Sequence, residues 1–289
     1  MTLVRAYISL MKLRVVELLL ISTIPAMILA EQGVPPLGLV IATLVGGTLA
    51  AGSANAFNMV LESDLDKLMK RTSARPLVTG ALSKIHATTF ATVIGALSLG
   101  IFWIYTEPLA TLLAAIAIAF YVIVYTMALK RHTSQNIVWG GAAGCMPVFI
   151  GWAAVTNSLS WAAVAFFFVI FFWTPPHFWA LAIKYKDDYE AAKIPMLPVI
   201  AARNIVVRNM WFHTVAMIVS SLALIYLTDL QWWAMMITVA LGLVFALQLV
   251  QLKENSENYN AVALKIFHWS ITYLTLFSAL LVIAQLLKA

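Results

Sequence analysis

Long apolar runs alternate with short polar segments along almost the whole chain of 289 residues. A run of about 20 apolar residues is the length that an α-helix needs to cross a membrane. Nine runs have roughly this length and predict nine transmembrane helices. They cover approximately residues 15–33, 36–61, 86–106, 108–128, 137–156, 161–183, 207–228, 230–252 and 266–287.

The composition agrees with a membrane protein and excludes an ordinary soluble domain. Hydrophobic residues make up 63% of the chain and charged residues only 10%. A net charge of +6 would point to nucleic acid in a soluble protein, but here the position of each charge matters more. The single cysteine, Cys145, excludes an intrachain disulfide.

The basic residues predict the orientation of the chain. With nine spans, every Lys and Arg except Lys288 lies at the N-terminus or in a loop on the same side. Positive charge stays in the cytoplasm, so we expect a cytoplasmic N-terminus and an external C-terminus. No transit-like extension precedes the first span, which favours a bacterial or archaeal plasma membrane.

The loop lengths predict an internal repeat. The two long loops, about 62–85 and 184–206, lie four spans apart on the cytoplasmic side. We therefore expect one all-α integral membrane domain over residues 1–289, with two four-helix units in parallel orientation plus a ninth helix. Parallel repeats of this kind place a shared site between the two halves.

The most informative polar segment follows the second span. Asn58, Glu62 and Asp66 recur every four residues, so a continued helix would place them on one face about 6 Å apart, while Asp64 would point elsewhere. Carboxylates near a helix C-terminus meet the negative end of the helix dipole and need a cation. Mg²⁺ suits such a site, because it takes a few carboxylates and completes its shell with water and phosphates.

Two arginines in the same segment add groups that suit phosphates. Arg71 and Arg75 follow the acidic face, and guanidinium groups bind oxyanions in a bidentate manner. The alternative is a solvated cytoplasmic loop with charges of both signs. Asn55 and Asn58 argue against it, because they fall inside the predicted span, where polar groups need partners.

A second constellation closes the sixth span. Pro175 and Pro176 are expected to break or kink this helix, which would leave His177 inside the membrane near the cytoplasmic loop. The charged residues that follow, Lys184, Asp187 and Asp188, are expected to face the first acidic cluster. The alternatives are a histidine bonded to a carbonyl and ordinary juxtamembrane charges.

A third polar segment follows the fourth span. Lys130 and Arg131 offer further phosphate-binding groups, although positive-inside charge explains them nearly as well. The small residues from Gly140 to Gly144 then open the fifth span. Inside an apolar helix they indicate close helix packing rather than a phosphate loop. Glu17, in the first span, either reaches the surface or joins the site.

Taken together, these segments resemble the intramembrane aromatic prenyltransferase superfamily. Its members carry an Asn-xxx-Asp-xxx-Asp motif after the second span and a second acidic motif after the sixth. Two strings, Thr174–Trp179 and Ile194–Pro198, are similar to those of the branch that farnesylates haem. The resemblance also covers residues 58–77, 130–144, 147, 151–152, 173–198 and 270–274.

The chain departs from the superfamily pattern at four positions. Glu62 stands where Asp is more usual, and Lys184 replaces the first Asp of the second motif, as expected for the haem branch. Leu13 interrupts an expected Lys-Pro-Arg, and Lys193 replaces a Gly. None of these changes removes a charge that the chemistry needs.

The resemblance implies a concrete reaction. Asn58, Glu62 and Asp66 would be the catalytic residues and would hold Mg²⁺ against farnesyl diphosphate. A vinyl group of haem B would take the farnesyl group, and water would complete haem O. The groups expected to stabilise the diphosphate are Arg71, Arg75, Lys130, Arg131 and Lys184.

The resemblance also raises candidates for acceptor contact and for partners. Among five histidines on or near the cytoplasmic side, His177 and His213 are the candidates for haem binding. Haem A synthase is a candidate protein partner. Two other functions stay open: a prenyltransferase for another aromatic or quinone-precursor acceptor, and a secondary transporter of an anion. Transporters place ionisable groups near the bilayer midplane, whereas here they gather at one interface.

Overall fold

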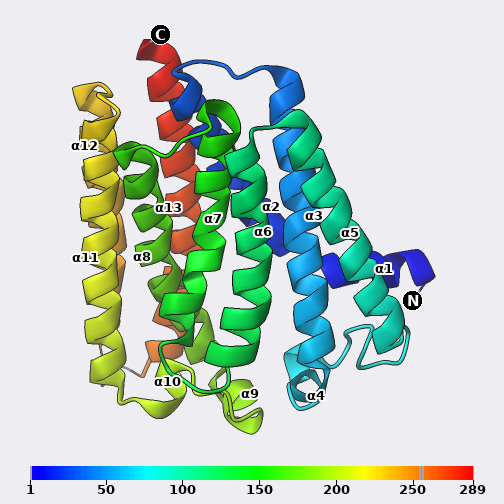
Figure 1. The fold of residues 1–289 in the computed structure, drawn as a ribbon. Helices are drawn as coiled ribbons and strands as arrows, with labels where there is room; N and C mark the ends of the chain where they lie inside the picture. Colours follow the sequence, from blue (N-terminus) through cyan, green and yellow to red (C-terminus); the bar gives the residue numbers. More distant parts are fainter. Residues whose placement is uncertain (1, 254, 256, 289) are drawn as a thin grey trace.

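The computed structural model describes residues 2–253, 255 and 257–288, and every regular element in this part of the chain is helical. Figure 1 shows a bundle of long helices with short helices at one end. The elements are α1 Leu3–Met11, α2 Leu13–Glu31, α3 Leu37–Leu61, α4 Ser63–Asp66, the 3₁₀-helix η1 Lys70–Thr72, α5 Lys84–Tyr105, α6 Pro108–Ala119, the π-helix η2 Phe120–Leu129, α7 Asn136–Thr156, α8 Trp161–Lys184, α9 Lys186–Ala191, α10 Leu197–Ile200, α11 Arg203–Leu227, α12 Trp232–Val250 and α13 Tyr259–Lys288.

Eight helices in the described residues are long and apolar enough to cross a membrane, with α6 and η2 counted as one. They coincide with the second to ninth predicted spans. The first predicted span corresponds to α2, which has 19 residues and whose fully described part, Leu20–Glu31, is apolar. The chain is therefore a multi-pass α-helical membrane protein.

Helix α1 precedes α2 as a separate element that the apolar pattern did not predict. It lies at an angle to the long helices, beside α3 and α5 (Figure 1). Its Ala6 and Leu10 are buried, whereas Leu3 and Val4 are exposed. Lys12 adopts a left-handed conformation, with φ of 52°, and so ends α1 and begins α2.

Helix α8 lies at the centre of the core. It packs against α7, α11 and α13 and is the most buried of the eight spans. Pro175 and Pro176 lie inside it, and the helix continues through both. The expected break at these prolines is therefore wrong. Neighbouring helices hold α8 on several sides, and transmembrane helices tolerate proline under that condition.

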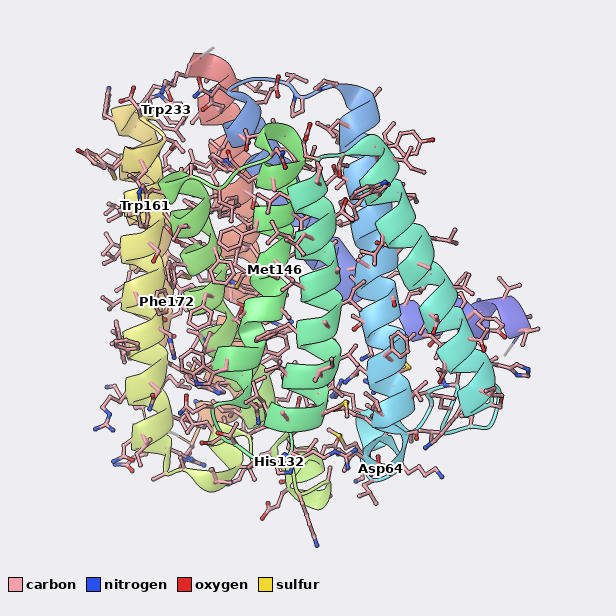
Figure 2. All side chains as sticks on the ribbon, viewed as in Figure 1. Asp64, His132, Met146, Trp161, Phe172 and Trp233 are labelled. Atoms are coloured by element: carbon pink, nitrogen blue, oxygen red, sulfur yellow. The ribbon has the colours of Figure 1, made fainter. Side chains whose placement is uncertain are left out.

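The two ends of the bundle differ in character. Figure 2 shows Asp64 and His132 at the end that carries α4, α9 and α10, and Trp161 and Trp233 towards the opposite end. Lys288 lies with Asp229 at that opposite end, 3.3 Å apart. Loops α3–α5 and α8–α11 meet at the first end, as the two long loops of the sequence predicted.

Candidate active site

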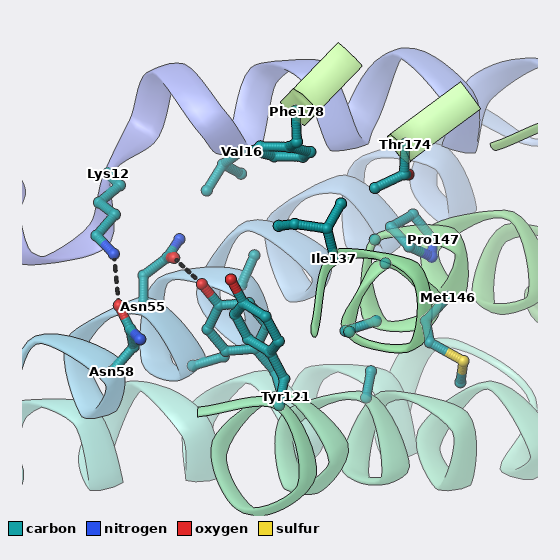
Figure 3. A pocket seen from close by; sticks show the side chains of 18 of the residues that line it. Lys12, Val16, Asn55, Asn58, Tyr121, Ile137, Met146, Pro147, Thr174 and Phe178 are labelled. Atoms are coloured by element: carbon teal, nitrogen blue, oxygen red, sulfur yellow. Dashed lines mark hydrogen bonds between the residues drawn. The ribbon is translucent and has the colours of Figure 1, made fainter. Parts of the chain in front are cut away.

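A cavity of about 320 Å³ lies between α2, α3, the α6–η2 helix, α7 and α8. Its end near α4 is polar and carries the acidic residues of the first motif. The remainder is an apolar corridor (Figure 3), lined by residues that include Val16, Ala50, Ile137, Met146 and Phe178. One space thus offers a charged end and a long hydrophobic channel.

The asparagine and the two carboxylates of the first motif share this cavity, and together they are called the acidic face. Asn58, Glu62 and Asp66 are only 1%, 2% and 4% exposed. Helix α3 ends at Leu61, yet backbone bonds of 2.9 Å from Glu62 N–H to Asn58 and from Asp66 N–H to Glu62 keep the helical spacing. The three side chains therefore line one cavity, as their spacing predicted.

Each of these three residues is paired with a basic side chain. Lys12 Nζ donates to Asn58 Oδ1 at 2.8 Å (Figure 3). Lys130 Nζ lies 2.5 Å from Glu62 Oε2. Arg75 Nη1 donates to both carboxylate oxygens of Asp66 at 2.6 Å. Basic side chains of the protein itself thus neutralise the acidic face in this structure.

Lys12 is a site residue that the sequence analysis did not identify. Two signals pointed to it: a basic residue just before an apolar run, which positive-inside charge explains, and its place as the Lys of the interrupted Lys-Pro-Arg string. Its position depends on the left-handed turn between α1 and α2, which directs the chain across α3. Nothing in the residue pattern indicated that turn.

The acidic face fits a divalent cation in one specific respect. Glu62 Oε1 is buried and has no hydrogen-bond partner, although such an atom normally needs one. Within the described residues, no three His, Cys, Asp or Glu side chains form a metal cluster. The third oxygen would therefore come from the Asn58 amide. Such a small set of oxygens suits Mg²⁺, which keeps water and phosphate ligands.

The wall opposite the acidic face comes from the π-helix η2. Lys130 N–H bonds to the carbonyl of Tyr125, five residues earlier. Tyr121 and Tyr125 line the cavity with ring centroids 5.2 Å apart, and the Tyr121 hydroxyl lies 3.5 Å from Asn55 Oδ1. A π-helix of this kind often marks a functional site. The sequence carries no recognisable signal for it.

The glycines of α7 allow this wall to approach closely. A Cβ atom on Gly140 would overlap the ring of Tyr125, and one on Gly141 would lie 2.9 Å from Thr174 Cγ2. The small residues thus serve close packing, as their place in an apolar helix predicted. Both glycines also line the cavity.

Arg71 connects the first motif with the second. It lines the cavity, and its backbone N–H donates to Asp188 Oδ2 at 3.2 Å. Asp187, Asp188 and Lys184 do not line the cavity themselves. Lys184 is exposed, with its ammonium group 5.4 Å from the ring centroid of Tyr185. The two motifs meet through Arg71, but the second motif lies outside the cavity.

Arg131 and Asp64 form a separate pair at the surface. Arg131 donates from Nη1 and Nη2 to the two oxygens of Asp64, both at 3.0 Å. This hydrogen bonding lowers the pKa of the Asp64 carboxyl. Asp64 has a side chain that is 61% exposed and, as predicted, points away from the acidic face. Arg131 does not line the cavity.

Both candidate histidines are buried. His177 Nδ1 lies 2.7 Å from the hydroxyl of Ser270, and its ring stacks on Trp173 at 4.3 Å. His213 packs against Trp179, with ring centroids 5.3 Å apart. Neither histidine lines the cavity. The side chain of Glu17 lies outside the described part of the structure.

The model of the UbiA prenyltransferase family matches residues 19–271 of the chain. The chain belongs to this family. The protoheme IX farnesyltransferase of Renibacterium salmoninarum is 50% identical to it over 275 residues, which is 94% of this chain and 86% of the relative. The enzyme of the same name from Frankia casuarinae is 51% identical over 273 residues, which is 94% of each chain.

Solved structures of UbiA homologues share the fold of this prenyltransferase. A structure described for digeranylgeranylglyceryl phosphate synthase has a TM-score of 0.80 at 14% identity and covers 99% of both chains. A UbiA homologue from Archaeoglobus fulgidus bound to GPP and Mg²⁺ has a TM-score of 0.67 at 17% identity and covers 96% of this chain and 99% of that one. At identities of 14% and 17%, this structural similarity establishes only that the chain shares the fold of these proteins.

Proposed function

We propose that this chain transfers the farnesyl group of farnesyl diphosphate to a vinyl group of haem B and yields haem O and diphosphate. The observation that carries the proposal is the cavity, in which an acidic end with basic partners continues into an apolar corridor. Such a space suits a substrate with an anionic head and an isoprenoid tail. The half-identical relatives named protoheme IX farnesyltransferase support haem as the acceptor.

The residues of the polar end would act on the diphosphate. Asn58, Glu62 and Asp66 would hold Mg²⁺, as the orphaned Glu62 Oε1 suggests. Bound Mg²⁺ supplies positive charge that stabilises the departing diphosphate. Arg75 and Lys130 would turn from the carboxylates to the phosphate oxygens, and Arg71 would join them from the cavity wall.

The remaining steps depend on the corridor. The carbon–oxygen bond of the allylic diphosphate breaks, and diphosphate leaves with the electron pair. The Tyr121 and Tyr125 rings would face the allylic cation and stabilise it through their π-electrons. The vinyl group then forms the new carbon–carbon bond with its own π-electrons. Water adds to the resulting cation and releases a proton. The apolar walls keep water from capturing the first cation.

A product assay tests this proposal directly. Purified protein in detergent is given haem B, farnesyl diphosphate and Mg²⁺, and products are identified by mass spectrometry. We expect haem O in the presence of Mg²⁺ and none after chelation with EDTA. Release of diphosphate without haem O would retain the prenyltransferase and reject haem as the acceptor. Absence of any metal-dependent diphosphate release would reject the proposed chemistry.

We further propose nine crossings of a plasma membrane, two parallel four-helix units with a ninth helix, and a cytoplasmic N-terminus and active site. Helix α2 would be the additional crossing, and its length of 19 residues supports this. The concentration of basic residues at the end of the bundle that carries α4 and α9 supports the orientation.

Cysteine labelling of intact cells tests the topology. In a Cys145→Ala background, we expect a membrane-impermeant maleimide to label Asp229→Cys but not Lys70→Cys, since both positions are exposed but lie at opposite ends. Thr2→Cys should stay unlabelled, like Lys70→Cys, because two crossings, by α2 and α3, would return the chain to the side of the membrane on which it began. Labelling of Thr2→Cys together with Asp229→Cys would mean that α2 does not cross.

A further inference from the structure

We infer that Thr126 is a positioning residue that holds the amide of Asn58 in one orientation, with its oxygen directed at the cation site. The inference deepens the proposed function and rests on it, because it concerns the same acidic face. Thr126 lies on η2, and its side chain contacts Asn58 of the neighbouring helix α3. Asn58 and Thr126 are both buried, at 1% and 2% exposure.

The two ends of the Asn58 amide have different partners. Its nitrogen donates to Thr126 Oγ1 at 3.2 Å. Its oxygen accepts from Lys12 Nζ at 2.8 Å. Only the oxygen can ligate a metal ion, so the orientation of this amide decides whether Asn58 contributes a ligand at all.

The hydroxyl of Thr126 can only accept from Asn58. It carries a single hydrogen, which it donates to the carbonyl of Tyr121 at 2.9 Å. A flipped amide would therefore place its oxygen against a lone pair of Thr126 with no hydrogen between them. The contact with Tyr121 thus converts a group that could accept or donate into a fixed acceptor.

The π-helix creates this arrangement. The buried threonines Thr43, Thr174 and Thr238 each donate to the carbonyl four residues earlier, as in an ordinary α-helix. Thr126 instead donates to the carbonyl five residues earlier. The wider turn of η2 presents the Thr126 oxygen to α3 while its hydrogen stays bonded to its own helix.

Lys12 alone does not secure the orientation during catalysis. Its ammonium group donates to Asn58 Oδ1, the same atom that would ligate the cation. A bound divalent ion would repel this ammonium group and take over the oxygen. The bond to Thr126 then remains as the hydrogen bond that fixes the amide. Outer partners of metal ligands act in this way, and their loss typically weakens metal binding by about 10- to 100-fold.

The test measures metal binding rather than turnover. Mn²⁺ is titrated by electron paramagnetic resonance into purified protein saturated with farnesyl thiodiphosphate, an analogue that resists cleavage. We expect Thr126→Val to raise the Mn²⁺ dissociation constant about tenfold or more and Thr126→Ser to restore it. Thr238→Val is the matched control, because it removes a buried threonine hydroxyl of α12 that lies outside the cavity.

Two further measurements make the result decisive. Thermal unfolding establishes that each variant is folded, and Thr126→Ala replaces Thr126→Val if the latter does not fold. Asn58→Ala serves as the reference for loss of the ligand. If wild type binds Mn²⁺ and Asn58→Ala weakens binding, but the Thr126 variants bind like wild type, the positioning role is wrong. If Asn58→Ala binds Mn²⁺ like wild type, Asn58 is not a ligand and the positioning role of Thr126 is also wrong, whereas absence of Mn²⁺ binding by wild type would reject the metal role of the acidic face.

Discussion

Replacing Glu62 with Gln should abolish haem O formation, with a loss of about a hundredfold or more in turnover. Glu62 is 2% exposed and carries the one carboxylate oxygen of the acidic face that has no partner. The substitution keeps the size of the side chain but removes the charge that would attract the metal ion. Asp66→Asn should have a similar effect, because it removes the other buried carboxylate. The measurement is haem O production at saturating farnesyl diphosphate and Mg²⁺.

Asp64→Asn is the matched control for this prediction. Asp64 lies between the two acidic residues in the sequence, but its side chain is exposed and pairs with Arg131 outside the cavity. An exposed ion pair contributes little to the stability of a protein, and this one lies outside the cavity. Turnover of Asp64→Asn should therefore stay within about twofold of wild type. Equal losses in all three variants would mean that the charge of the whole loop matters rather than the acidic face.

Replacing Gly140 with Ala should remove most of the activity, although the change adds only one methyl group. The added Cβ would meet the ring of Tyr125, with Tyr125 Cε2 at 2.6 Å. The ring would have to move, and it lies against Tyr121 and near Lys130. Overpacking of this kind typically costs about 1–3 kcal/mol and shifts the side chains around it. Both haem O production and the thermal unfolding midpoint should therefore fall.

Gly100→Ala is the corresponding control. Gly100 lies within α5, and a Cβ atom there would meet nothing within 4 Å. Alanine also favours a helix over glycine by about 1 kcal/mol, so this variant should be as active and at least as stable as wild type. Wild-type turnover in Gly140→Ala would show that the position of the Tyr125 ring does not matter for the reaction.

The sequence predicted the spans well because membrane crossing leaves a strong signal. The apolar runs locate α3, α5, α7 and α8 to within a few residues of their observed ends. The spacing of Asn58, Glu62 and Asp66 also predicted a shared face, because backbone hydrogen bonds continue the helical register past the end of α3. The apolar runs and the four-residue spacing both depend only on residues close together in the sequence, so helix geometry alone is enough to interpret them.

Features that depend on three-dimensional placement could not be predicted in this way. Lys12 reaches Asn58 from a left-handed turn, and Lys130 reaches Glu62 from the end of the π-helix η2. The same limit explains why the sequence pattern predicts Arg131 and Lys184 as diphosphate-binding groups together with Lys130, although neither lines the cavity. Charge and chain position are alike in these residues. Lys130 and Arg131 are neighbours in the turn after η2, yet Lys130 points to Glu62 in the cavity and Arg131 points to Asp64 at the surface.

The three built-in pairs of the acidic face have a consequence for the end of the catalytic cycle. Arg75 and Lys130 each have a carboxylate partner waiting within the protein. In an enzyme that works as proposed, these carboxylates compete with the product for the same cations once the reaction is over. The carboxylates of Asp66 and Glu62 then displace diphosphate, because they are held close to the same cations and so have a high effective concentration. The resting pairs would thus make product release part of the return of the enzyme to its resting state.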